Sequence, residues 1–167
     1  GNIPNLIGKD IENIDKLEYI IEKLFQIREK RIHPFKDDKI LTAWNALMIS
    51  ALAYGGRVFE NKEYIKKAKD AYDFIKNNLV RKDGRLLARF RHGEAAYIAY
   101  LEDYSFLVWA LIELYEATFE SKFLKEALYF QDEMIKLFWD EKSYGFFHSG
   151  KDGEKLILNL KDSYDTA

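Results

Sequence analysis

Carboxylates stand beside aromatic rings at three points in the sequence, about sixty residues apart. Aromatic rings stack on the apolar face of a pyranose, and carboxylates bind sugar hydroxyls or act as general acid and base. The pattern therefore predicts carbohydrate handling. The acid–base candidates are Asp38, Asp103 and Asp162. The residues expected to contact the substrate are Trp44, Asn45, Glu102, Tyr104 and Tyr164.

The same acids have a simpler interpretation as helix caps. Asp37 or Asp38 precedes an apolar helical pattern and can cap it. Glu102 and Asp103 fall in the first turn of another helix, where the helix dipole favours an anion. Both interpretations stay open, because one helix start can cap and also border a site.

Histidines offer an alternative acid–base set, since imidazole transfers protons near neutral pH. The candidates are His33 and His92, with His148 as a third, and they would abstract a proton beside a carbonyl in an epimerase or isomerase. In "RFRHG", Arg89 and Arg91 alternate onto one strand face, where they can hold an anionic or carbonyl oxygen. No histidine pair has the spacing of metal ligands, so we expect no metal site. No phosphate or dinucleotide motif occurs, so we expect no cofactor.

The composition is that of a soluble globular domain. The 167 residues carry a net charge of −2 and contain no cysteine. So small a net charge supplies no field for nucleic acid or an anionic membrane, and no apolar run is long enough to span a bilayer. The absence of cysteine excludes disulfides and thiolate chemistry. We expect no nucleic-acid or membrane partner and a cytoplasmic location.

Periodic apolar residues predict the elements that must position these side chains. Helices are expected over residues 10–29, 40–54, 61–79, 102–118 and 121–138. Gly55-Gly56 is expected to end the second helix, while Asn61 and Ser121 are expected to cap the third and fifth. A short strand is predicted over residues 85–91, and a β-hairpin is predicted in the tail around residues 151–153.

A repeat becomes visible when these segments are aligned. Leu41 aligns with Leu101, Trp44 with Tyr104, and a third copy begins at Leu160. Each unit has an apolar inner helix, an amphipathic outer helix and a short extended piece. This organisation predicts a mainly α fold of stacked helical hairpins with short β-hairpins between repeats. We expect residues 1–167 to form one domain, to be part of a longer array, and to self-associate through the uncovered flank of a hairpin.

Four segments resemble the thioredoxin-fused spermatogenesis-associated protein family. They are "RIHPFKDDKILTAWNALMISALA", "LEDYSFLVWALIELYEATFESKFLKEAL", "LFWDEKSYGFF" and "LKDSYDTA". The resemblance runs from Arg31 onward and implies part of a six-hairpin (α/α)6 toroid, similar to N-acylglucosamine 2-epimerases and six-hairpin glycosidases. It also implies a thioredoxin-like domain as a partner in the full-length parent. The chain departs from the family at Thr166, where a glycine is usual, and it lacks the thioredoxin cysteines.

Two functions follow as alternatives. In the first, the toroid of the parent protein binds or converts a carbohydrate, as an epimerase, isomerase or glycosidase would. In the second, the helical array is a scaffold that works with the thioredoxin-like domain and has no chemistry of its own.

Overall fold

The computed structural model describes residues 14–161 and divides the chain into two units, Gly1–Asp37 and Asp38–Ala167. The first unit contains helix α1 (Ile14–Glu29), whose apolar residues, such as Ile21 and Leu24, are exposed within this unit. Residues 10–13 of the predicted first helix lie outside the described part. The extent of the toroid domain over residues 1–167 stays a prediction.

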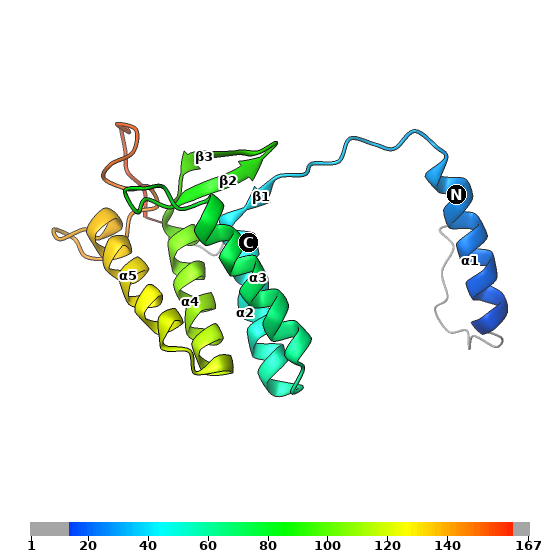
Figure 1. The fold of residues 1–167 in the computed structure, drawn as a ribbon. Helices are drawn as coiled ribbons and strands as arrows, with labels where there is room; N and C mark the ends of the chain where they lie inside the picture. The colour runs from blue at the N-terminus through cyan, green and yellow to red at the C-terminus, as the bar shows by residue number, and fades with distance from the viewer. Residues whose placement is uncertain (1–13, 162–167) are drawn as a thin grey trace. The chain divides into compact units, whose positions relative to one another are not determined.

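The second unit is built from two helical hairpins (Figure 1). Helix α2 (Thr42–Val58) pairs with α3 (Lys62–Asn78), and α4 (Leu101–Thr118) pairs with α5 (Ser121–Phe138). The apolar helices α2 and α4 pack against each other, which makes them the inner pair. The fully buried side chains at their centre come mostly from α2 and α4: Ala46, Ile49, Ala53, Tyr104, Leu107 and Leu111. The predicted mainly α fold of stacked hairpins is confirmed.

The helix boundaries confirm some of the predicted caps and correct others. The Asn61 side chain accepts a hydrogen bond from the Glu63 N–H at 2.9 Å, so the predicted cap of α3 is confirmed. At α5 the cap position is occupied by Glu120, and Ser121 is already the first helical residue, so the Ser121 cap was wrong. The predicted capping of α2 by Asp37 or Asp38 was also wrong. Leu41 occupies the N-cap position of α2, and its side chain makes no capping hydrogen bond.

The pair Gly55-Gly56 does not end α2, as the sequence predicted, because the helix continues to Val58. Gly56 is buried in the last turn of α2. A Cβ atom added there would lie 2.5 Å from Cγ1 of Ile65 and 3.1 Å from its backbone nitrogen. The glycine therefore serves a close approach of two helices rather than helix termination.

A small antiparallel sheet lies at the leading ends of the inner helices (Figure 1). Its order is β1 (Ile40–Leu41), β2 (Leu87–Arg91) and β3 (Glu94–Ile98). The predicted strand over residues 85–91 is confirmed from Leu87 onward. The sequence analysis did not predict β3. The two-residue turn His92-Gly93 joins β2 to β3 with positive φ at both positions, as a tight hairpin requires.

The hairpin predicted for the tail was wrong, because described residues 139–161 contain turns and only an isolated bridge between Trp139 and Phe146. Backbone hydrogen bonds still tie this segment to the repeat starts. The Leu101 N–H donates to the His148 oxygen at 3.1 Å, and the His148 N–H donates to the Leu160 oxygen at 2.9 Å. The turn at residues 150–153 closes on itself instead of pairing two strands.

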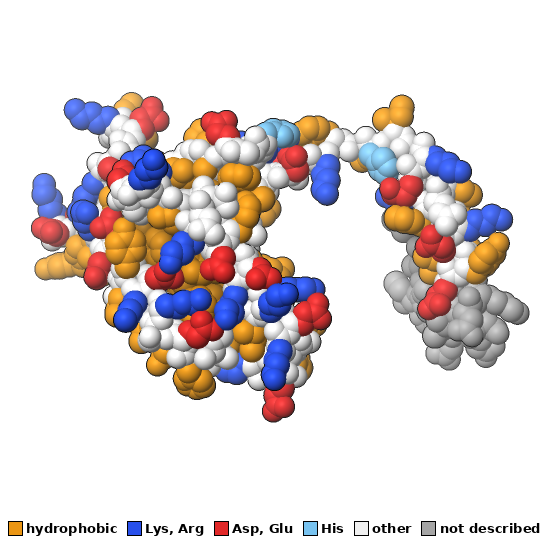
Figure 2. Space-filling view, in the orientation of Figure 1, with side chains coloured by type: hydrophobic (Ala, Val, Ile, Leu, Met, Phe, Trp, Pro, Cys, Tyr) orange, Lys and Arg blue, Asp and Glu red, His pale blue; other side chains and the backbone are white. Residues whose placement is uncertain are grey.

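The surface of the hairpins mixes both signs of charge with apolar side chains (Figure 2). The inner helices expose large apolar residues that include Trp44, Met48, Tyr54 and Trp109. Within residues 14–161, no helix is long and apolar enough to cross a membrane. Self-association through the uncovered flank stays a prediction.

Candidate functional site

The starts of the two inner helices are tied together by one buried carboxylate. Oδ1 of Asp103 accepts the backbone N–H of Ala43 at 2.9 Å, and Oδ2 accepts the N–H of Tyr100 at 2.8 Å. Asp103 therefore caps its own helix and the first turn of α2, whose own cap residue provides no side-chain acceptor. Only 3% of Asp103 is exposed. Burial raises the pKa of its carboxyl to about 6, against the lowering effect of the two backbone donors.

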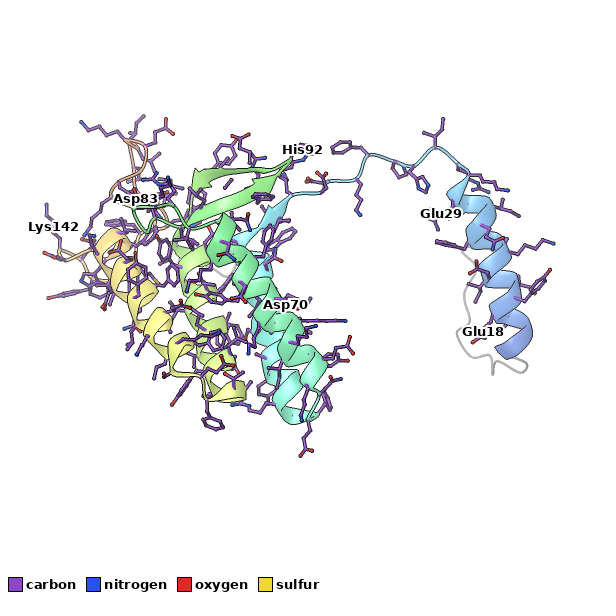
Figure 3. All side chains as sticks on the ribbon, in the orientation of Figure 1. Glu18, Glu29, Asp70, Asp83, His92 and Lys142 are labelled. Carbon is purple, nitrogen blue, oxygen red and sulfur yellow. The ribbon has the colours of Figure 1, made fainter. Side chains whose placement is uncertain are left out.

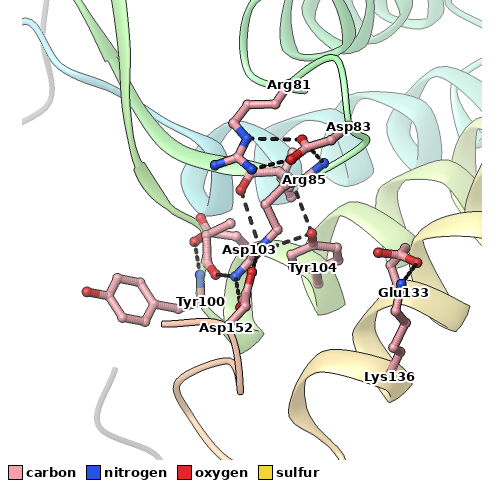
Figure 4. Close-up of polar contacts among 11 residues, drawn as sticks. Arg81, Asp83, Arg85, Tyr100, Asp103, Tyr104, Glu133, Lys136 and Asp152 are labelled. Atoms are coloured by element: carbon pink, nitrogen blue, oxygen red, sulfur yellow. Dashed lines mark hydrogen bonds and ion pairs between the residues drawn. The ribbon is translucent and has the colours of Figure 1, made fainter. Parts of the chain in front are cut away.

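Arg85 forms a second buried network just before β2 (Figure 4). Its Nη1 donates to the Tyr104 hydroxyl at 3.0 Å, and its Nη2 donates to the backbone oxygen of Ala99 at 3.0 Å. Nε and Nη2 of the guanidinium also donate hydrogen bonds to the Asp152 carboxylate, at 2.8 and 3.2 Å. A single buried arginine thus joins the β3–α4 connection to the turn that follows α5. Bidentate Arg–carboxylate geometry fixes that turn in orientation as well as in position.

These two segments form the walls of a pocket of about 230 Å³. One wall is the end of β3 and the β3–α4 connection, with the exposed side chains of Tyr97 and Tyr100. The other wall follows α5 and contributes Ser149, Glu154 and Leu156. Because Arg85 holds Ala99 on the first wall and Asp152 on the second, its guanidinium sets the distance between them. The pocket presents aromatic rings, a hydroxyl and a carboxylate to a ligand.

The Tyr100 ring of the pocket wall stacks on the ring of His148. The rings of Tyr100 and His148 are 5.1 Å apart with 23° between their planes. His148 precedes Ser149 of the pocket, and its backbone connects Leu101 to Leu160. The third histidine candidate therefore lies next to the pocket wall.

The other two histidines lie elsewhere. His92 is exposed at the tip of the β2–β3 hairpin (Figure 3). His33 belongs to the first unit, where its ring contacts Glu29, one helical turn earlier. Among residues 14–161, no cluster of His, Asp and Glu is arranged to hold a metal ion. The acid–base roles of His33 and His92 stay predictions.

The predicted acids are dispersed. Asp38 is exposed and accepts a hydrogen bond from Nε of Arg91 at 2.6 Å, an interaction that lowers the pKa of its carboxyl. Asp103 is buried with both oxygens occupied, which supports the capping interpretation and gives no support to catalysis. Asp162 and Tyr164 lie outside the described residues. A catalytic role for these three acids stays a prediction.

The predicted substrate contacts divide by exposure. Trp44 and Glu102 are exposed, and Asn45 donates from its amide to the Leu41 oxygen at 2.8 Å. Tyr104 has no exposed surface, and its hydroxyl accepts from Arg85 and from the Leu86 N–H. A residue with no exposed surface offers nothing for a substrate to touch, so the structure gives that contact no support.

The sequence analysis missed the residues that form the pocket. Arg85 was assigned only to the start of a strand, and Tyr97, Tyr100 and Glu154 were not singled out. A signal for the two tyrosines was present, because they come just before the start of an inner helix, and the sequence analysis had already singled out Trp44 near the start of the other. No local signal marks Arg85, since Asp152 is 67 residues away in sequence.

Comparison with known proteins gives both sequence relatives and structural neighbours. The chain is 39% identical over 171 residues to human spermatogenesis-associated protein 20, covering 96% of the chain and 22% of that protein. The rat protein of the same name is 38% identical over 88% of the chain. The chain thus spans about a fifth of the length of these relatives. No family model matches it.

The structural neighbours are sugar-converting enzymes. Cellobiose 2-epimerase from Bacillus thermoamylovorans superposes with a TM-score of 0.65 at 19% identity, over 76% of this chain and 34% of that one. A sugar epimerase from a ruminal bacterium superposes with a TM-score of 0.60 at 21% identity, over 67% of this chain and 30% of that one. At these identities the likeness shows the fold, which is part of an (α/α)6 toroid.

Proposed function

The chain is homologous to a segment of the spermatogenesis-associated protein 20 family, and we propose that it forms a carbohydrate-binding part of a sugar-converting toroid in its parent protein. The observation that carries this proposal is the pocket between the β3–α4 connection and the segment after α5. Its Tyr97 and Tyr100 rings suit the apolar face of a pyranose, and Ser149 and Glu154 suit its hydroxyls. The epimerase-like fold agrees with this chemistry but does not by itself establish it.

The position of the pocket adds support. It adjoins the start of inner helix α4, and Arg85 and Asp103 hold that start rigidly. A preorganised site loses less conformational entropy when a ligand binds. Conversion of the bound sugar belongs to the same proposal, with Asp38, Asp103, Asp162 and His92 as the predicted acid–base groups of this unit.

Calorimetric titration with glucose, mannose and cellobiose tests the binding step. The decisive variant is Tyr97→Ala, because Tyr97 is 68% exposed in the pocket wall. We expect it to weaken sugar binding about two- to tenfold, the effect of losing about 0.5–1.5 kcal/mol of ring contact. Tyr144→Ala is a matched control, since Tyr144 is 72% exposed, also has positive φ and lies outside the pocket.

Two results would contradict the proposal. Equal weakening by both tyrosine variants would show that the effect is not specific to the pocket. No binding of any of the three sugars would favour the scaffold that works with a thioredoxin-like domain.

A further inference from the structure

The geometry points to a ligand that carries an anionic group, a carboxylate or a phosphate on a sugar, with Arg89 as the residue that binds this group. The inference rests on the carbohydrate function proposed above and narrows the class of ligand. Three observations support it. The two arginines of β2 differ in their ion pairing, Arg89 lies on the face of the sheet that borders the pocket, and the backbone of Tyr97 has a positive φ.

Arg89 and Arg91 differ in how their charges are compensated. Arg91 donates from Nε to the Asp38 carboxylate at 2.6 Å. Arg89 has no carboxylate partner among residues 14–161, and its buried Nε has no hydrogen-bond partner there. A guanidinium that is partly removed from water without a counter-ion is costly, and an anionic ligand would relieve that cost.

Arg89 lies on the pocket side of the sheet. It pairs with Ala96 on β3, while Leu87, two residues before it, pairs with Ile98. Side chains two residues apart on a strand share a face. Ile98 lines the pocket. Phe90 contacts Phe74 of α3, which identifies the opposite face of the sheet. Arg89 therefore belongs to the face that borders the pocket.

Tyr97 connects Arg89 to the pocket. Regular alternation would place Tyr97 on the face opposite Arg89, but its φ of 63° breaks the alternation. The guanidinium carbon of Arg89 lies 4.9 Å from the centre of the Tyr97 ring, and the same ring lines the pocket. A positive φ in a tyrosine is strained and persists only where the surroundings hold it. Here the same ring contacts the Arg89 guanidinium and lines the cavity, so that the cation lies beside the cavity.

The pocket is electrostatically asymmetric. Glu154 places a carboxylate on the wall that follows α5, where it repels anions and accepts from hydroxyls. Arg89 adjoins the opposite wall through Tyr97. A sugar with hydroxyls at one end and a carboxylate or phosphate at the other matches both walls.

Titration calorimetry at low and moderate ionic strength, with glucose, glucuronate and glucose 6-phosphate, tests the inference. We expect at least one acidic sugar to bind at least tenfold more tightly than glucose, with an advantage that falls as salt screens the charge. Glucuronate and glucose 6-phosphate distinguish a carboxylate from a phosphate ligand. In Arg89→Gln the advantage should disappear, so that glucose and the acidic sugars bind with similar affinity. In Arg91→Gln, which alters the neighbouring paired arginine, the advantage should remain.

A second measurement reports on Arg89 directly. The NMR signal of its Nε–H should shift during titration with the acidic sugar and stay constant with glucose. Binding of glucose with no preference for the acidic sugars would overturn this inference and leave the carbohydrate function standing. Binding of none of the three would overturn both. An acidic preference that survives Arg89→Gln would also overturn the assignment.

Discussion

The Asp103 carboxylate accepts the backbone N–H of Ala43, and these two residues occupy the same position in successive repeats. Leu41 aligns with Leu101, so the second residue after each is Ala43 in one repeat and Asp103 in the next. One repeat thus provides the cap that its predecessor lacks. The inner helices are held in register by a side chain rather than by apolar packing alone.

This link predicts an unusual pH dependence. The pKa of Asp103 is raised from 3.8 to about 6, so between these values the folded protein binds a proton that the unfolded chain has released. The contribution of Asp103 to the free energy of unfolding is therefore largest below pH 4 and is lost as pH rises to 6. The size of the loss is about 3 kcal/mol.

Urea unfolding of the wild type and of Asp103→Asn at pH 4, 5, 6 and 7 measures how the contribution of Asp103 to the free energy of unfolding changes with pH. The stability of the wild type relative to the variant should decrease across this range. Glu141→Gln, at an exposed position, should show no such trend. Parallel curves for the wild type and Asp103→Asn would rule out the raised pKa.

The two glycines near the end of α2 should respond oppositely to alanine. A Cβ at Gly55 would meet its nearest neighbours at 3.9 Å, so Gly55→Ala should raise the free energy of unfolding by up to about 1 kcal/mol. A Cβ at Gly56 would collide with Ile65, so Gly56→Ala should lower it by about 1–3 kcal/mol. Denaturant unfolding of the pair checks this, and equal effects would show that α2 and α3 do not approach as described.

These glycines illustrate what the sequence could predict. Helix periodicity and the Asn61 cap depend on residues within a few positions of one another, and both were predicted correctly. Gly55-Gly56 has the form of a helix stop, and only the approach of Ile65 explains why Gly56 is required. The predicted cap of α2 failed for a related reason, because an acceptor for the α2 start comes from sixty residues away. The predicted cap of α5 was off by one position, since Glu120 precedes the helix and Ser121 begins it.

The candidate site was less predictable than the fold. The polar residues at the inner-helix starts were found from their recurrence in the repeat, but the structure assigns Asp103 and Tyr104 to internal hydrogen bonds. The pocket depends on which residues the chain brings beside Tyr97 and Tyr100. The residues brought beside these tyrosines come from the segment after α5, which the sequence analysis predicted to be a β-hairpin.

Removing the Tyr104 hydroxyl should destabilise the protein although the ring remains. The hydroxyl accepts from Arg85 at 3.0 Å and from the Leu86 N–H at 3.1 Å, and the residue is fully buried. Tyr104→Phe leaves two buried donors without this acceptor, which should lower the free energy of unfolding by about 1–3 kcal/mol. Tyr144→Phe, at an exposed tyrosine, should change it by less than about 0.5 kcal/mol. Similar losses in the two variants would contradict the buried network.

The turn after α5 should loosen when its contact with Arg85 is broken. Asp152→Asn removes the negative charge that faces a guanidinium only 5% exposed, while the Asp152 side chain itself is 40% exposed. Because water partly compensates, we expect a loss of about 1–3 kcal/mol rather than that of a fully buried pair. The amide of Gly153, which donates to the Gly150 oxygen, should then exchange hydrogen at least tenfold faster. Glu63→Gln weakens an exposed pair with Lys67 on α3 and should leave this exchange unchanged. Unchanged exchange at Gly153 in Asp152→Asn would show that Arg85 does not hold the second wall of the pocket.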